Sequence, residues 1–314
     1  MAREVFPFFC SILYLSLHLL MYLYGYPELK DSDSNLHLTL IEHQRNSGYQ
    51  NFLYIGAVYH IIIALLSEIF SVSPELAKFS LSISLYFYTL SKVKTQDMYI
   101  TVFFFTPILV IFSSTMNRDD LIIYGILIAF SYAQHEKPGS AILVLVITSL
   151  IRPSLFLALF FVIIINSKKL YIIYNKKIYR YLIFGIGLTF ILFLLKWLID
   201  HGFIISYINF IRAFTGPISY SAGTIYSQYP PLIIGTIMVQ FWFWFFVCKI
   251  IKTFVKNTLS LSLIKAITLV GILLFPYTLF DNFVGPRQSL NLWLLTFLFL
   301  YGVRMNADIN RNTV

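Results

Sequence analysis

The sequence has 314 residues, of which 58% are hydrophobic and 12% are charged, and its mean hydropathy is +0.77. Soluble domains carry about 25% charged residues, so this composition excludes a mainly soluble protein and predicts membrane spans joined by short loops. The net charge of +9 does not predict a nucleic-acid partner, because the placement of Lys and Arg in a membrane chain matters more than their sum.

Apolar segments follow one another along the whole chain. The first contains about 20 apolar residues and is not followed by a small-residue cleavage site, so we interpret it as an uncleaved first span. In chain order the apolar segments are 4–26, 51–72, 76–91, 98–115, 120–134, 140–166, 179–199, 231–250, 261–280 and 288–303.

Two of these segments do not fit a single upright span. Residues 140–166 are too long, and Arg152-Pro153 interrupts them, so we interpret them as two short spans that meet at this break. The rival interpretation makes 140–166 a single tilted span and 51–72 a true crossing. Residues 51–72 carry His60 and Glu68, and we interpret them as a juxtamembrane helix that lies flat at the outer surface.

The distribution of basic residues orients the chain. The loop at 167–180 holds five basic residues and no acidic one, so it is predicted to be cytoplasmic. The resulting arrangement has ten crossings with both termini in the cytoplasm. It places 15 of the 23 Lys and Arg inside and Lys196 within a span. The seven outer ones are Lys30, Arg45, Lys78, Arg118, Arg152, Arg212 and Arg287.

The predicted fold class is therefore an all-α polytopic membrane protein, with about ten transmembrane helices and one juxtamembrane helix. The chain forms a single integral-membrane domain of the bacterial inner membrane. Its predicted parts are a first span at 4–26, an external loop with the juxtamembrane helix at 27–75, a helical half at 76–199, an external loop at 200–230 and C-terminal spans at 231–304.

Charged residues gather at the predicted outer ends of the spans. Arginines there suit a phosphate or pyrophosphate, because the guanidinium keeps its charge and offers a planar fork of donors. We expect Asp119 or Asp120 to pair with Arg118 or Arg152 and to orient it toward that phosphate. The alternative is that the charged residues anchor span ends, and that Asn117, Asp119 or Asp120 caps a helix. The residues concerned are Arg118, Asp119, Asp120, Arg152, Arg212, Asp281 and Arg287.

Several common sites are missing from the sequence. There is no phosphate-binding glycine loop, no dinucleotide fingerprint and no nucleophile elbow. Cys10 and Cys248 lie far apart, and the spacing of His37 and His43 does not suit a metal, so no metal site or cofactor is predicted. Because no part of the chain could form a soluble nucleotide-sugar domain, a sugar donor would be linked to a lipid.

The first half of the chain resembles the glycosyltransferase-C superfamily in the order of its segments. The matching segments are "NFLYIGAVYHIIIALLSEIF", "SVSPELAKFSLSISLYFYTLSK", "FFFTPILVIFSSTMNRDDLIIYGILIAF" and "AILVLVITSLIRPSLFLALFFVIII". The resemblance implies a polyprenyl-linked sugar donor at the outer face and a catalytic carboxylate in the first external loop. Asp33 in "DSDS" best fits that position, with Asp31 second.

Three functions follow from these observations. The first is an integral-membrane glycosyltransferase of cell-surface polysaccharide biosynthesis, in which Asp33 activates a glycan or lipid-linked acceptor and arginines hold the donor phosphate. The second is a Wzy-type repeat-unit polymerase of O-antigen or capsule, which the chain also resembles. The third is a transporter, which the scarcity of charges in the middle of the spans disfavours. Membrane lipids are partners in each case.

Overall fold

The computed structural model describes residues 2–23, 32–49, 57–93, 95–152, 155–170, 241, 245, 248, 291 and 294–302. These residues form helices joined by turns and contain no strand, which confirms the all-α prediction for this part of the chain. The predicted spans at 179–199 and 261–280 lie outside the described residues, as do the loop at 200–230 and most of 231–250.

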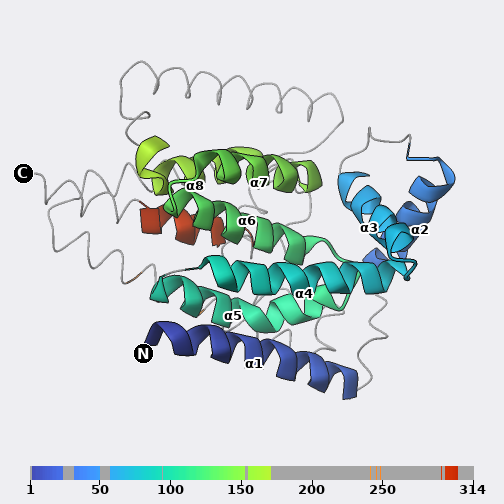
Figure 1. The fold of residues 1–314 in the computed structure, drawn as a ribbon, viewed down its shortest axis with the longest axis horizontal. Helices are drawn as coiled ribbons and strands as arrows, with labels where there is room; N and C mark the ends of the chain where they lie inside the picture. The colour runs from blue at the N-terminus through green and yellow to red at the C-terminus, as the bar shows by residue number, and fades with distance from the viewer. Residues whose placement is uncertain are drawn as a thin grey trace, which may run out of the picture. The chain divides into compact units, whose positions relative to one another are not determined.

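Figure 1 labels the helices α1 to α8 of the described residues. They are α1 (Ala2–Leu23), α2 (Ser32–Asn46), α3 (Ala57–Ile69), α4 (Pro74–Lys92), α5 (Gln96–Ser113), α6 (Asp119–Gln134), α7 (Pro138–Ile151) and α8 (Phe156–Asn166). Residues 291 and 294–302 are also helical.

Two of the described helices are long and apolar enough to cross a membrane, namely Val5–Leu23 and Gln96–Ser113. Helices α3 and α4 together would make a third, but they meet at an angle of 103°. The remaining apolar helices are shorter than the roughly 20 residues of a full span. Ten crossings therefore stay a prediction, while membrane association follows from the apolar helices.

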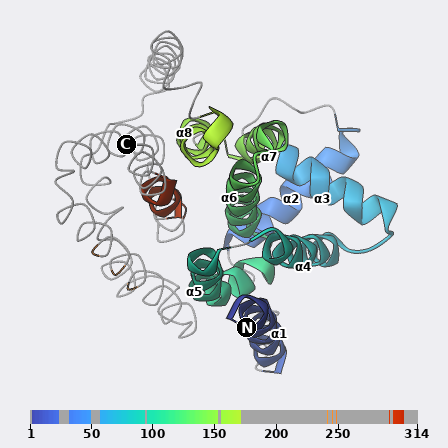
Figure 2. The ribbon, with the colours of Figure 1, turned by 60° about the vertical axis from the view of Figure 1, so that its left-hand side comes forward.

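The chain divides into two compact units, and the first contains α1 to α5, α6 as far as Ile128, and residues 146–153. In this unit α1 packs mainly on α5 and also contacts α4 (Figure 2). The Tyr86 hydroxyl donates to the Cys10 carbonyl over 2.9 Å, and the Tyr14 and Tyr86 rings stack with centroids 3.8 Å apart. The opposite face of α1 exposes Phe8 and Phe9, as expected for a helix in contact with lipid.

The second unit contains the end of α6 from Ala129, the start of α7 as far as Leu145, and α8. Glu136, just before α7, accepts hydrogen bonds from the backbone N–H groups of Lys168 and Lys169 over 2.8 and 3.1 Å. The start of α7 and the end of α8 therefore lie together. This arrangement confirms the break near Arg152 and shows that the rival interpretation of one continuous helix over 140–166 is wrong.

Helices α6 and α7 approach closely at Gly125. A Cβ atom there would lie 2.2 Å from Thr148 Oγ1 and 3.2 Å from Thr148 Cβ, and rotating the threonine side chain leaves the second close contact unchanged. We expect Gly125→Ala to lower the free energy of unfolding by about 1–3 kcal/mol through overpacking.

The matched control is Gly139→Ala in α7, where a Cβ would have no atom within 4 Å. This variant should be neutral or more stable by about 0.4–1 kcal/mol, because alanine restricts the unfolded chain. Thermal unfolding of both variants in the same detergent measures the difference. Equal unfolding temperatures for the two variants would show that the α6–α7 contact is not tight.

Candidate functional site

The turn between α5 and α6, residues 114–118, is fixed by hydrogen bonds from several elements. The buried Tyr59 hydroxyl of α3 donates to the Met116 carbonyl over 2.6 Å. The side-chain oxygen of Asn117 accepts from the backbone N–H of Asp119 over 3.2 Å. Asn117 therefore satisfies a free N–H at the start of α6, and this contact leaves the two aspartates available for other partners.

Asp119 forms an ion pair with Arg152, with 3.0 Å between Oδ1 and Nη1. Both side chains are nearly buried, at 7% and 9% exposure. Arg118 is half-buried and donates through Nη1 to the Ile151 carbonyl at the end of α7 over 3.2 Å. The sequence predicted that one of the two aspartates would pair with Arg118 or Arg152, and the structure confirms the pairing for Asp119.

Asp120 points to a different helix. Its Oδ2 accepts from Lys78 Nζ over 3.0 Å and from Ser82 Oγ over 2.6 Å. Lys78 also donates to the Phe112 carbonyl. Lys78 and Asp120 are fully buried, with side-chain exposures of 1% and 0%. A buried ion pair needs further hydrogen bonds to its two groups, and here Ser82 donates to Asp120 while the Phe112 carbonyl accepts from Lys78. The other carboxylate oxygen of Asp120, Oδ1, is buried without a hydrogen-bond partner among the described residues.

This ion pair was not predicted, because Lys78 was counted among the seven basic residues on the outer side and no partner was assigned to it. The signal that could have revealed it is the spacing of polar residues in α4. Lys78, Ser82, Tyr86 and Thr89 recur at intervals of four, four and three residues, which places them on one face of a helix. All four are buried. A polar face on a helix of a membrane protein indicates an interior with polar partners.

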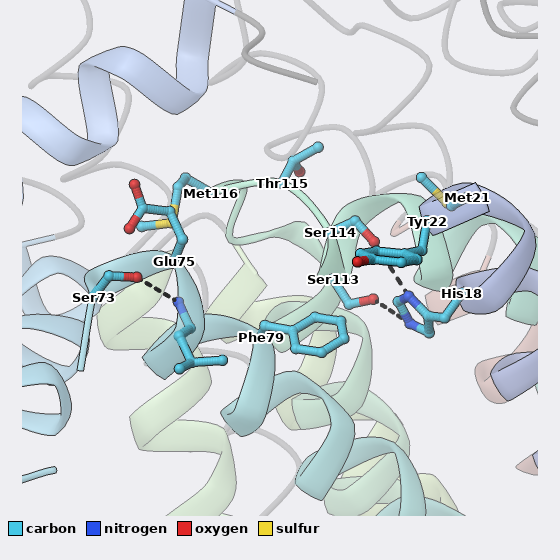
Figure 3. Close-up of a pocket in the computed structure, with 11 residues that line it drawn as sticks. His18, Met21, Tyr22, Ser73, Glu75, Phe79, Ser113, Ser114, Thr115 and Met116 are labelled. Atoms are coloured by element: carbon cyan, nitrogen blue, oxygen red, sulfur yellow. Dashed lines mark hydrogen bonds between the residues drawn. The ribbon is translucent and has the colours of Figure 1, made fainter. Parts of the chain in front are cut away.

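A cavity of about 370 Å³ lies beside the turn, within the first unit. Its polar lining residues include Glu75, in the first turn of α4, and Thr115 in the turn (Figure 3). The described residues that line it are His18, Met21, Tyr22, Ser73, Glu75, Leu76, Phe79, Ser113, Ser114, Thr115 and Met116.

Helix α1 is tied to this cavity by His18. The ring nitrogens of His18 lie 3.0 Å from Ser113 Oγ and 3.3 Å from Ser114 Oγ. Its ring also meets Phe79 edge-on, with centroids 5.2 Å apart. Ser113 directly follows Phe112, whose carbonyl accepts from Lys78. The wall of the cavity is thus continuous with the buried ion pair of Lys78 and Asp120.

Part of the segment that the sequence predicts as the first external loop is helical. Residues 32–46, expected as an acidic loop, form α2, and α2 packs on α3. Arg45 lies 3.6 Å from Glu68, and His37 Nδ1 lies 2.8 Å from His60 Nε2. Leu and Glu in the second half of α2 favour a helix. The many charged and polar residues of this segment led to the prediction of a loop.

Of the predicted site residues, the structure places Arg118, Asp119 and Arg152 together at the turn, whereas Asp120 pairs with Lys78 of α4. Asp33 lies in the first turn of α2, and only its backbone is described. Asp31, Arg212, Asp281 and Arg287 lie outside the described residues. Glu75, His18 and Lys78 are the additional polar residues that the sequence did not indicate.

No group of three or more His, Cys, Asp or Glu side chains that could hold a metal ion occurs in the part of the chain that the structure describes. Comparisons with protein-family models, curated proteins and solved structures find no match for this chain.

Proposed function

We propose that the protein is an integral-membrane glycosyltransferase of cell-surface polysaccharide biosynthesis, which takes its sugar from a polyprenyl-linked donor at the outer face. The observation that carries this proposal is the placement of Arg118 and Arg152 at one turn. Asp119 holds one guanidinium from a nearly buried position, and a cavity suited to a small ligand lies beside the same turn.

The arginines would act on the donor phosphate. When the bond between the sugar C1 and the phosphate oxygen breaks, its electron pair stays on the phosphate. A preorganised positive charge stabilises the leaving group more than it stabilises the intact donor, and this difference accelerates the step. Arg118 and Arg152 are the described residues for this role, and Arg212 and Arg287 complete the proposed set.

The acceptor requires a base. In the proposed reaction Asp33 takes the proton from the acceptor hydroxyl as the new bond between its oxygen and the sugar C1 forms, with Asp31 as the second candidate. Asp119 positions Arg152 and is not itself a base, because its carboxylate is engaged in the ion pair. Asp120 stabilises α6 against α4 through Lys78.

The direct test is an assay of lipid-linked glycans in a strain that lacks the gene. If the protein is a glycosyltransferase, the surface glycan of this strain should lack one sugar, and its polyprenyl-linked precursor should accumulate. Accumulation of complete single repeat units would instead identify a repeat-unit polymerase. An unchanged profile of lipid-linked and surface glycans would contradict both activities.

The proposed mechanism requires the turn to face outward, with α6 returning to the cytoplasm before residue 137. In a Cys248→Ser background, a membrane-impermeant thiol reagent should label Glu75→Cys in intact cells and spare Lys137→Cys. Both positions are exposed, and the remaining Cys10 is buried. Labelling of Lys137→Cys alone would place the turn in the cytoplasm and exclude an outer-face site there.

A further inference from the structure

The charged group that lines the cavity beside the turn is a carboxylate, whereas the arginines that would bind phosphate are positively charged. Among its described lining residues, Glu75 is the only carboxylate, and none is a lysine or arginine. A phosphate placed in the cavity would be repelled by Glu75 and would find no guanidinium or ammonium group in the lining. Charge therefore favours a neutral ligand with hydroxyl donors.

The lining also has two chemically distinct parts. Met21, Leu76, Phe79 and Met116 supply apolar surface, and Figure 3 shows the Phe79 ring between the Glu75 side of the cavity and the His18 side. Hydroxyl groups come from Tyr22, Ser73, Ser113, Ser114 and Thr115. A pyranose ring matches this division, because its C–H faces pack on apolar and aromatic groups while its hydroxyls bond to carboxylates and other hydroxyls.

The volume of about 370 Å³ falls at the lower end of the range for small-molecule sites, which suits a short saccharide and is too small for a long polyprenyl chain. We propose that this cavity binds an uncharged sugar ring, with Glu75 accepting hydrogen bonds from its hydroxyls and Phe79 packing against its face. The inference rests on the proposed transferase function and assigns the sugar to a place distinct from the phosphate.

Binding can be measured on the purified full-length protein in detergent by saturation-transfer difference NMR. The probes are the methyl glycosides of glucose, galactose, mannose, rhamnose and N-acetylglucosamine. At least one glycoside should bind the wild type. Glu75→Gln should weaken that binding about tenfold or more, because it removes a charge-assisted hydrogen bond. Leu76→Trp should abolish it by filling the cavity.

Two matched controls keep these results interpretable. Glu42 and Leu65 are exposed residues of α2 and α3 that are not among the lining residues, so Glu42→Gln and Leu65→Trp should bind like the wild type. All variants should show wild-type elution and unfolding temperature. Absence of binding for every glycoside, or equal binding by the wild type and Leu76→Trp, would overturn the proposal.

A second comparison tells which sugar occupies the cavity. If it holds the sugar of the donor, the 1-phosphate of the bound sugar should bind more tightly than the methyl glycoside, and Arg118→Gln should remove that gain. If the cavity holds the sugar of the acceptor, the 1-phosphate should bind no more tightly than the methyl glycoside.

The proposed function and the cavity can fail separately. Glycoside binding together with an unchanged glycan profile in the deletion strain would overturn the transferase and retain the sugar site. A missing sugar in that strain without any glycoside binding would overturn the sugar site alone.

Discussion

Replacing Lys78 with methionine should lower the free energy of unfolding by about 3–5 kcal/mol, which is the usual effect of removing one partner from a buried ion pair. Asp120 would keep its hydrogen bond from Ser82 but would lose its counter-charge in a fully buried position. The Phe112 carbonyl would lose a donor as well. We expect much less folded protein in the membrane and a lower unfolding temperature in detergent.

The double variant Lys78→Met with Asp120→Leu separates charge from packing. Because it leaves no uncompensated charge, it should recover most of the stability that the single variant loses. Lys137→Met, at an exposed lysine, serves as the control and should unfold like the wild type. If the double variant is as unstable as Lys78→Met alone, then an uncompensated charge on Asp120 does not explain the stability that the single variant loses.

Replacing Arg152 with glutamine should abolish the glycan product, because a neutral amide cannot stabilise the charge that develops on the leaving phosphate. Arg152→Lys retains a positive charge beside Asp119 but lacks the planar fork, so we expect product to fall about tenfold or more. Both variants are measured by complementing the deletion strain and comparing product with the amount of folded protein in the membrane.

The matched control is Arg45→Gln, which removes an arginine whose partner Glu68 is half exposed. Exposed ion pairs contribute about 0–1 kcal/mol, so this variant should make normal product. Asp119→Asn removes the charge that positions Arg152 and should lower product, whereas it should leave binding of a methyl glycoside in the cavity unchanged. Normal product from Arg152→Gln would show that Arg152 connects α6 to the end of α7 and takes no part in catalysis.

The all-α class could be predicted from composition alone, because a chain with so few charged residues must satisfy its backbone within helices. The break near Arg152 was also predictable, since a charged residue followed by proline interrupts a long apolar run. An ion pair between an aspartate and an arginine at the turn followed from the clustering of opposite charges.

Other parts of the site depend on contacts between distant segments. The sequence shows Lys78 and Asp120 as two charges near helix ends. The spacing of polar residues in α4 indicates a buried face, but the partner of Lys78 is known only from its ion pair with Asp120 of α6. The cavity likewise combines residues from α1, α4 and the turn. Glu75 stands in the sequence as an ordinary acidic residue in the first turn of a helix, a position that the helix dipole alone would explain.

The hairpin of α7 and α8 has a consequence for how the chain enters a membrane. Helix α7 has 14 residues and α8 has 11, which correspond to lengths of about 21 and 16 Å, so neither matches a hydrocarbon layer of about 30 Å. A translocon that recognises segments one at a time would have little reason to release either helix into lipid. The two should therefore enter together, after Lys168 and Lys169 have emerged from the ribosome and Glu136 has closed the hairpin.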